Sequence, residues 1–292
     1  MVAKQSSIIN NCCENHTERT AAYRLLNNKN LTMEEIVSRL SKNCAQGCSG
    51  LSHVLCIQDT TEVVFHHSGR LSHEDKDFGY GTSEYNEYSI FAHPSMVVDA
   101  VSLMPVGFSY MKVWSRDRAQ DKTSHVVDTV KQAMECIEWY KCRWFIEELF
   151  RVCKSEGFRI ESVQLESGAA VKKLTVLTMY AALRCMTLKR AYDEQDESVP
   201  ANRMFDEQEM EMLEVEMEYI HRKSPKALDG RNPFHENSLP WAAWIIARLG
   251  GWSGYVKAHG RPGYITMKKG LDRFNQHLEI IAFAKAKFVY KE

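Results

Sequence analysis

Three segments rich in Val, Ile, Thr and Phe follow one another in the chain, and a long stretch with helical periodicity comes after them. The segments are residues 53–65, 91–104 and 107–116. β-Branched and aromatic residues favour strands, and the Met-Pro-Val-Gly sequence at residues 104–107 predicts a hairpin turn between the last two segments. Apolar residues then recur at helical spacing from residue 124 to Gly157. We therefore expect an α+β fold with a three-stranded antiparallel sheet.

Helices are predicted on both sides of this region. Residues 17–26 favour a helix, and Thr32 with Glu35 forms a capping box that opens a second helix to Leu40. Further helices are expected at residues 174–192, 240–249 and 266–283. An acidic segment forms one more, with an apolar face made of Met210, Leu213, Met217 and Ile220.

Charge gives no overall signature of a nucleic-acid partner, because 37 Lys and Arg residues balance 38 Asp and Glu residues and the net charge is −1. The charge is uneven along the chain: acidic residues gather between positions 193 and 218, and basic ones between 248 and 292. Arg19, Arg24 and Arg39 in the N-terminal helices suit either a small DNA-contacting module or a helical hairpin with solvated arginines.

The sequence predicts a cytoplasmic location for the protein. No stretch reaches the roughly 18 uninterrupted apolar residues of a membrane span, and residues 1–15 lack the apolar segment of a signal peptide. We therefore expect a cytoplasmic protein with no membrane partner.

The predicted helix around residue 147 has one strongly polar face, and apolar residues occupy the opposite side. The polar residues fall within an arc of about 80° on a helical wheel; they are Tyr140, Arg143, Glu147, Arg151 and Lys154. A carboxylate flanked by cations suits a divalent metal beside a phosphodiester, because Glu ligates the ion and the cations hold phosphates. The alternative is a solvated helix with salt bridges, since Glu and Arg pairs four residues apart are common.

The spacing Tyr-x2-Arg-x3-Glu-x6-Lys, formed here by Tyr140, Arg143, Glu147 and Lys154, resembles the signature of the bacterial DDE transposases of insertion-sequence family four. VLCIQDTTEV around Asp59 is similar to the strand that carries the first catalytic Asp of this family. TERTAAYRLLNN resembles the N-terminal DNA-binding helices. ESGAAVKKL, PWAAWIIARLGGW and GRPGYITMKKGLDRF resemble the C-terminal region, so the similarity covers most of residues 17–278.

The resemblance implies a ribonuclease-H-like core that cuts and joins DNA at transposon ends with Mg²⁺ or Mn²⁺. It makes Asp59 the first metal ligand and Glu147 the last. It also implies that four side chains contact the phosphates of double-stranded DNA at the inverted-repeat ends: Tyr140, Arg143, Arg151 and Lys154. His93 and Asp99 are expected to be structural.

One part of the family pattern has no counterpart in this chain. A DDE enzyme needs a further carboxylate on a fourth strand, but only residues 117–125 separate the third strand from the predicted helix, and a parallel neighbouring strand needs a crossover of about a dozen residues. We therefore expect an incomplete ribonuclease-H-like core and little or no cleavage. The Asp59 strand is left at a sheet edge, where self-association is expected.

These expectations give three regions: a partial helical DNA-binding region at 1–50, a shortened catalytic core at 51–192 and a C-terminal helical region at 193–292. The main interpretation is a defective transposase of this family. The alternative is a non-catalytic DNA-binding or dimerising protein that pairs with a full-length transposase and inhibits it.

Overall fold

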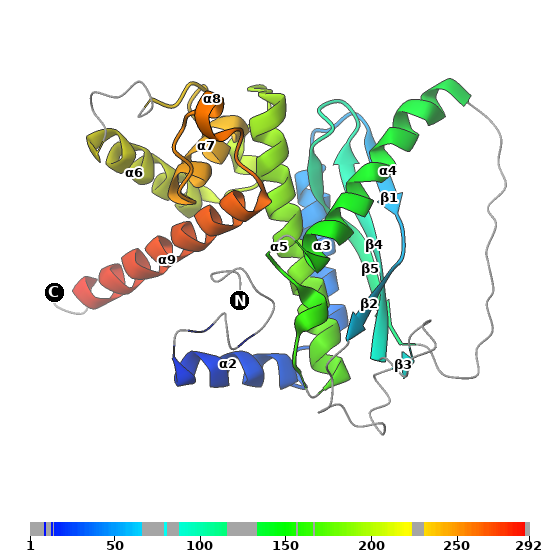
Figure 1. Cartoon of the computed structure of the whole chain (residues 1–292). Helices are drawn as coiled ribbons and strands as arrows, with labels where there is room; N and C mark the ends of the chain where they lie inside the picture. The colour runs from blue at the N-terminus through cyan, green and yellow to red at the C-terminus, as the bar shows by residue number, and fades with distance from the viewer. Residues whose placement is uncertain are drawn as a thin grey trace. The chain divides into compact units, whose positions relative to one another are not determined.

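The computed structural model of the protein describes residues 9, 13, 15–65, 79–80, 88–115, 133–155, 157–165, 167–223 and 231–289. Figure 1 labels the elements. They are α2 (His16–Asn27), α3 (Met33–Gly47), β1 (Val54–Gln58), β2 (Thr61–Phe65), β3 (Gly79–Tyr80), β4 (Tyr88–Asp99), β5 (Pro105–Trp114), α4 (Ala133–Lys154), the 3₁₀ turn η2 (Ile160–Ser162), α5 (Gly168–Glu194), the 3₁₀ turn η3 (Ala201–Arg203), α6 (Glu207–Lys223), α7 (Leu239–Leu249), α8 (Val256–His259) and α9 (Tyr264–Val289).

The chain divides into two compact units, residues 7–182 and residues 1–6 with 183–292. Helix α5 contributes its first part to one unit and its last part to the other. Among the described residues, no helix is long and apolar enough to cross a membrane.

The N-terminal helices begin at side-chain caps. Asn15 accepts a hydrogen bond from the Glu18 N–H at the start of α2, and Thr32 accepts one from the Glu35 N–H at the start of α3, as the capping box predicts. Helix α3 continues beyond the expected end at Leu40 to Gly47. The reason is that its buried stripe continues to Cys44, one turn after Leu40.

The sheet is antiparallel, and β4 is its central strand, which confirms the expected α+β class. β1 and β2 pair with one edge of β4, and β5 pairs with the other; the short β3 also pairs with β4. The single first strand expected at residues 53–65 is divided into β1 and β2. Among the described strands, β1 and β2 form an edge of the sheet.

The hairpin turn predicted at residues 104–107 was wrong. The chain turns at residues 100–104 instead, and a hydrogen bond from the Asp99 N–H to the Met104 carbonyl closes this turn. Pro105 and Gly107 belong to β5. The Asp99 carboxylate accepts hydrogen bonds from the Val101 N–H and the Ser102 hydroxyl. These local bonds satisfy the turn, so Asp99 is structural, as expected.

The division between β1 and β2 lies opposite a proline. β1 and β2 keep the same register along β4, and this register places Asp59 opposite Pro94. The main-chain groups of Glu62 and Val64 point away from β4, toward side chains outside the sheet. Because main-chain groups alternate in direction along a strand, those of Asp59 face β4. Pro94 has no N–H to donate, so β4 offers no main-chain donor to the edge strand at the level of Asp59.

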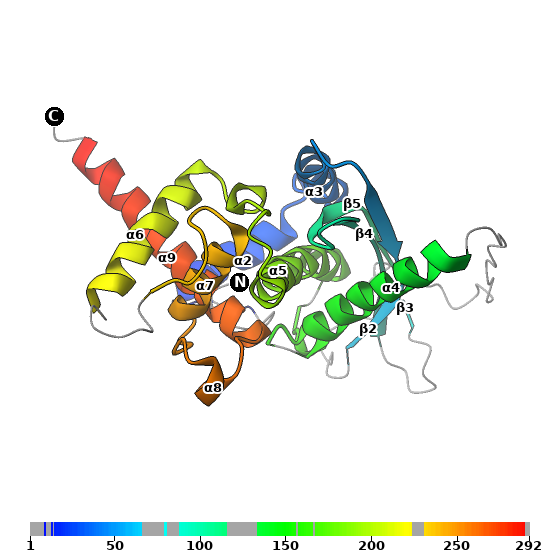
Figure 2. The ribbon, with the colours of Figure 1, turned by 90° about the horizontal axis from the view of Figure 1, so that it is seen from above.

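Helices cover the two faces of the sheet. On one face, Cys44 of α3 lies over Gly107 of β5, where an added Cβ would be only 2.8 Å from the Cβ of Cys44. On the other face, Val63 of β2 borders a small internal space together with Phe150 of α4 and Met179 of α5. Figure 2 shows α3 on one side of the strands and α4 on the other.

In the unit formed mainly by residues 183–292, helices α7 and α9 cross at very short range. Every residue of α7 except Arg248 is buried. A Cβ on Gly270 would lie 1.8 Å from the Ile246 carbonyl oxygen, and one on Gly250 would lie 2.1 Å from that of Thr266. Only glycine allows this approach.

Helix α6 buries a different stripe from the one expected. Leu213 and Ile220 are buried as predicted, but Met212 and Glu216 are buried beside them, whereas Met210 and Met217 are only partly buried. The Glu216 carboxylate bonds to Nδ1 of His277 on α9. The contact with His277 offsets the cost of burying the Glu216 carboxylate. A pattern of apolar residues gives no sign of such a buried charged residue.

Helix α9 also contains a buried ion pair. Lys268 and Asp272 are almost completely buried, with 3.7 Å between Nζ and Oδ2. Burial raises the pKa of the Asp272 carboxyl to about 7, and the neighbouring Lys268 offsets only part of this effect.

Gly270→Ala is expected to destabilise the protein by about 1–3 kcal/mol or more, because the new methyl group forces α7 and α9 apart. Gly263→Ala is the control, since a Cβ there meets no atom within 4 Å, and it should change the free energy of unfolding by less than about 0.5 kcal/mol. Urea denaturation followed by circular dichroism measures both. Equal midpoints for the two variants would contradict the close crossing.

The Asp272 pKa predicts a pH dependence. The carboxyl holds its proton more tightly in the folded chain than in the unfolded chain, so its contribution to stability is complete at low pH and is lost as the pH rises toward and through 7. Relative to Asp272→Asn, the wild type should lose up to about 1.4 kcal/mol of stability per pH unit in this range. Parallel stability profiles of the two proteins between pH 5 and 8 would contradict this prediction.

Candidate metal and DNA-contact site

Helix α4 has the two faces that the sequence predicts. Six apolar or sulfur-bearing side chains are buried: Cys142, Phe145, Ile146, Leu149, Val152 and Cys153. Arg143, Glu147 and Arg151 are exposed on the opposite side, and Lys154 is partly buried. Tyr140 lies on α4, but its side chain falls outside the described part of the structure.

Asp59 lies at the interruption between β1 and β2. Its Oδ1 accepts a hydrogen bond from the Thr60 N–H at 2.8 Å. The Thr60 hydroxyl lies 2.8 Å from Nδ1 of His93, the residue next to Pro94 on β4. Thr60 is therefore contacted through both its N–H and its hydroxyl, and the Oδ2 of Asp59 is the oxygen that Arg143 approaches.

One guanidinium joins the two carboxylates that the sequence proposes as metal ligands. NH2 of Arg143 lies 3.6 Å from Oδ2 of Asp59 and 3.5 Å from Oε1 of Glu147. All three side chains are partly exposed, by 49% for Arg143, 33% for Asp59 and 45% for Glu147, so solvent reaches the group. The structure thus brings Asp59 of the sheet edge and Glu147 of α4 to one point.

The other two cations of this face have partners of their own. Arg151 pairs with Glu148 at 3.3 Å. Nζ of Lys154 donates to the Glu62 carbonyl oxygen at 2.5 Å and lies 3.1 Å from the Glu161 carboxylate. Glu161 also accepts from the N–H of Val64 in β2, at 3.4 Å. Lys154 and Glu161 therefore tie the end of α4 and η2 to the outer edge of β2.

The carboxylate pair fits a hard divalent cation. Mg²⁺ is commonly held by one or two protein carboxylates together with water and phosphate oxygens, which is what Asp59 and Glu147 offer. Within the described ranges, no group of three or more His, Cys, Asp and Glu side chains forms a metal site. Residues 117–125, where the further carboxylate of a DDE enzyme was sought, lie outside the described residues.

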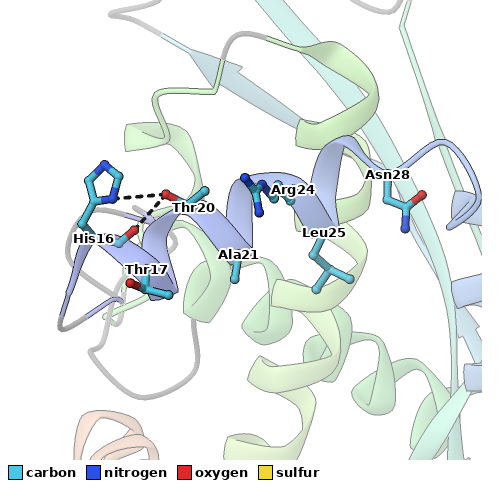
Figure 3. A pocket seen from close by; sticks show the side chains of 7 residues that line it. All are labelled: His16, Thr17, Thr20, Ala21, Arg24, Leu25 and Asn28. Atoms are coloured by element: carbon cyan, nitrogen blue, oxygen red, sulfur yellow. Dashed lines mark hydrogen bonds between the residues drawn. The ribbon is translucent and has the colours of Figure 1, made fainter.

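A second candidate surface lies on α2. Figure 3 shows a hollow lined by residues of this helix and its end: His16, Thr17, Thr20, Ala21, Arg24, Leu25 and Asn28. The Thr20 hydroxyl donates to the His16 carbonyl. Arg24 on this helix and Arg39 on α3 are exposed, whereas Arg19 is partly buried. Two exposed arginines are compatible with a DNA-contacting module and equally with a solvated hairpin.

Comparison with known protein families gives a match over one part of the chain. No curated protein matches the chain. Residues 42–184, just under half of the chain, match the family model described as the transposase DDE domain. This range contains the whole sheet, Asp59, α4 and Glu147. This part of the chain is therefore similar to a transposase DDE domain.

Proposed function

We propose that the chain is an internally shortened transposase of insertion-sequence family four, with Asp59 and Glu147 as ligands of Mg²⁺ or Mn²⁺. One observation supports the proposal most strongly. The Asp59 carboxylate at the sheet edge and the Glu147 carboxylate of α4 both contact the guanidinium of Arg143. Phosphates of double-stranded DNA at the transposon ends would be contacted by the cationic face of α4: Tyr140, Arg143, Arg151 and Lys154. The site of action is the cytoplasm.

The residues of the site have separable tasks in this proposal. A bound divalent ion stabilises charge on a phosphodiester during in-line displacement. Asp59 and Glu147 hold that ion from two elements, so its position depends on the packing of α4 against β1. Arginine forks match phosphate geometry, so Arg143 and Arg151 fix the DNA backbone beside the carboxylates.

We further propose that cleavage is defective, because DDE chemistry uses two metal ions and the pair Asp59–Glu147 leaves them under-ligated. The ribonuclease-H-like core would then be incomplete between β5 and α4. In the alternative function, the chain binds transposon ends without cutting them and inhibits a full-length transposase by pairing with it or with its DNA. Self-association belongs to the same alternative. The division into regions 1–50, 51–192 and 193–292 stays part of this proposal.

Cleavage is tested with the purified full chain and a labelled duplex carrying the inverted repeats that flank its gene, in Mg²⁺ or Mn²⁺. We expect a gel shift and no more than weak nicking, because the metal ions are under-ligated. Asp59→Ala should leave the shift in place. Robust nicking that Asp59→Ala abolishes would contradict the defect and would establish Asp59 as a catalytic residue. Absence of any shift would contradict both functions.

Lys154 is expected to matter for stability as well as for DNA. Lys154→Met deprives the Glu161 carboxylate and the Glu62 carbonyl of their partner and should cost about 1–3 kcal/mol in chemical denaturation. Arg151→Gln breaks an exposed pair and should cost less than about 1 kcal/mol. It should also lower the slope of log affinity against log salt for DNA by about one. Equal stability of the two variants would contradict the Lys154 contacts.

A further inference from the structure

We propose that Arg143 acts as an internal cation that occupies the Asp59–Glu147 pair until a DNA phosphate draws it away, so that binding of DNA and binding of a divalent ion are coupled. The inference rests on the proposed function, since it takes the two carboxylates as the metal site. It adds a regulatory role for a side chain that the sequence assigns only to phosphate contact.

The contacts place Arg143 and a divalent ion in competition. The guanidinium contacts one oxygen of Asp59 and one of Glu147 through the same nitrogen. The Oδ1 of Asp59 is already hydrogen-bonded to the Thr60 N–H. A divalent ion held by both side chains would therefore use the oxygens that Arg143 now contacts. The positive charges of the ion and the guanidinium repel each other at such short range, so occupancy by one disfavours occupancy by the other.

Arg143 is able to leave. Its side chain is about half exposed, and it reaches Glu147 within its own helix, four residues away. Exposed ion pairs of this kind contribute little to stability, so the loss of these two contacts costs little. A phosphate can accept two parallel hydrogen bonds from arginine, whereas Arg143 reaches each carboxylate here through one nitrogen atom only. DNA backbone beside α4 therefore favours the released state of Arg143.

The neighbouring cations do not have this arrangement. Arg151 contacts Glu148, and Lys154 contacts Glu161 and a main-chain carbonyl. Neither contacts the Asp59 or Glu147 carboxylate in any described ion pair. We therefore place the coupling on Arg143. Linkage then requires that DNA raise the affinity for the ion by the same factor by which the ion raises the affinity for DNA.

The test measures Mn²⁺ binding to the full chain by electron paramagnetic resonance, with and without a duplex carrying the flanking inverted repeats. Binding by the duplex alone is subtracted, and site binding is defined as the part lost in Asp59→Asn. In the wild type, DNA should raise Mn²⁺ affinity about fivefold or more. In Arg143→Gln, affinity without DNA should already be raised about fivefold, and DNA should add little.

Two further variants distinguish displacement of the Arg143 guanidinium from an effect of its positive charge alone. Arg143→Lys keeps the charge, but a compact ammonium lacks the fork that joins both carboxylates, so its DNA-free affinity should lie between wild type and Arg143→Gln. If charge alone matters, Arg143→Lys equals the wild type. Arg222→Gln removes an arginine from an exposed pair with Glu218 on α6, also four residues apart, and should bind Mn²⁺ as the wild type does.

The outcomes distinguish this inference from the function on which it rests. If Asp59→Asn lowers Mn²⁺ binding but Arg143→Gln leaves it unchanged or weakens it, the coupling is wrong and the metal site stands. If Asp59→Asn binds Mn²⁺ as the wild type does, the metal site and the coupling both fail. A thermal melt by circular dichroism confirms that each variant is folded before it is compared.

Discussion

The proline that lies opposite Asp59 in β4 determines how the candidate site is built. β4 is the strand to which the rest of the sheet is bonded, and a proline in it removes one donor at the level of Asp59. The edge strand is interrupted there and resumes in the same register two residues later. Asp59 therefore lies outside the hydrogen-bonded ladder, although the strand segments on both sides of it keep their register. The hydroxyl of the neighbouring Thr60 contacts His93.

The second requirement is that α4 lie across this interruption. Its buried face, which includes Ile146 and Leu149 at no measurable exposure, fixes the rotation of the helix, and the rotation presents Arg143 and Glu147 to Asp59. Asp59 and Glu147 carry like charges, and the guanidinium of Arg143 contacts both. A cation of the chain itself therefore offsets their mutual repulsion.

Periodicity and caps predicted most of the fold, because those signals are local: the Thr32 cap, the α4 faces and the order of three antiparallel segments follow from neighbouring residues. The turn at residues 100–104 was missed because Pro105 and Gly107 are typical turn residues that here lie in a strand. Asp59 and Glu147 were proposed from the family resemblance, whereas no sequence signal pointed to Glu161. It follows α4 in a short irregular stretch, and its role depends on a contact with a distant strand. The proline at the centre of a predicted strand was a usable signal for the interruption.

The contacts of Lys154 and Glu161 also bear on how this protein avoids aggregation. An edge strand offers unpaired N–H and C=O groups to strands of other molecules, and β2 is apolar enough to attract them. Here the outward carbonyl of Glu62 and the outward N–H of Val64 are already taken by charged side chains. Lys154 and Glu161 therefore protect part of the β2 edge from pairing with an incoming strand.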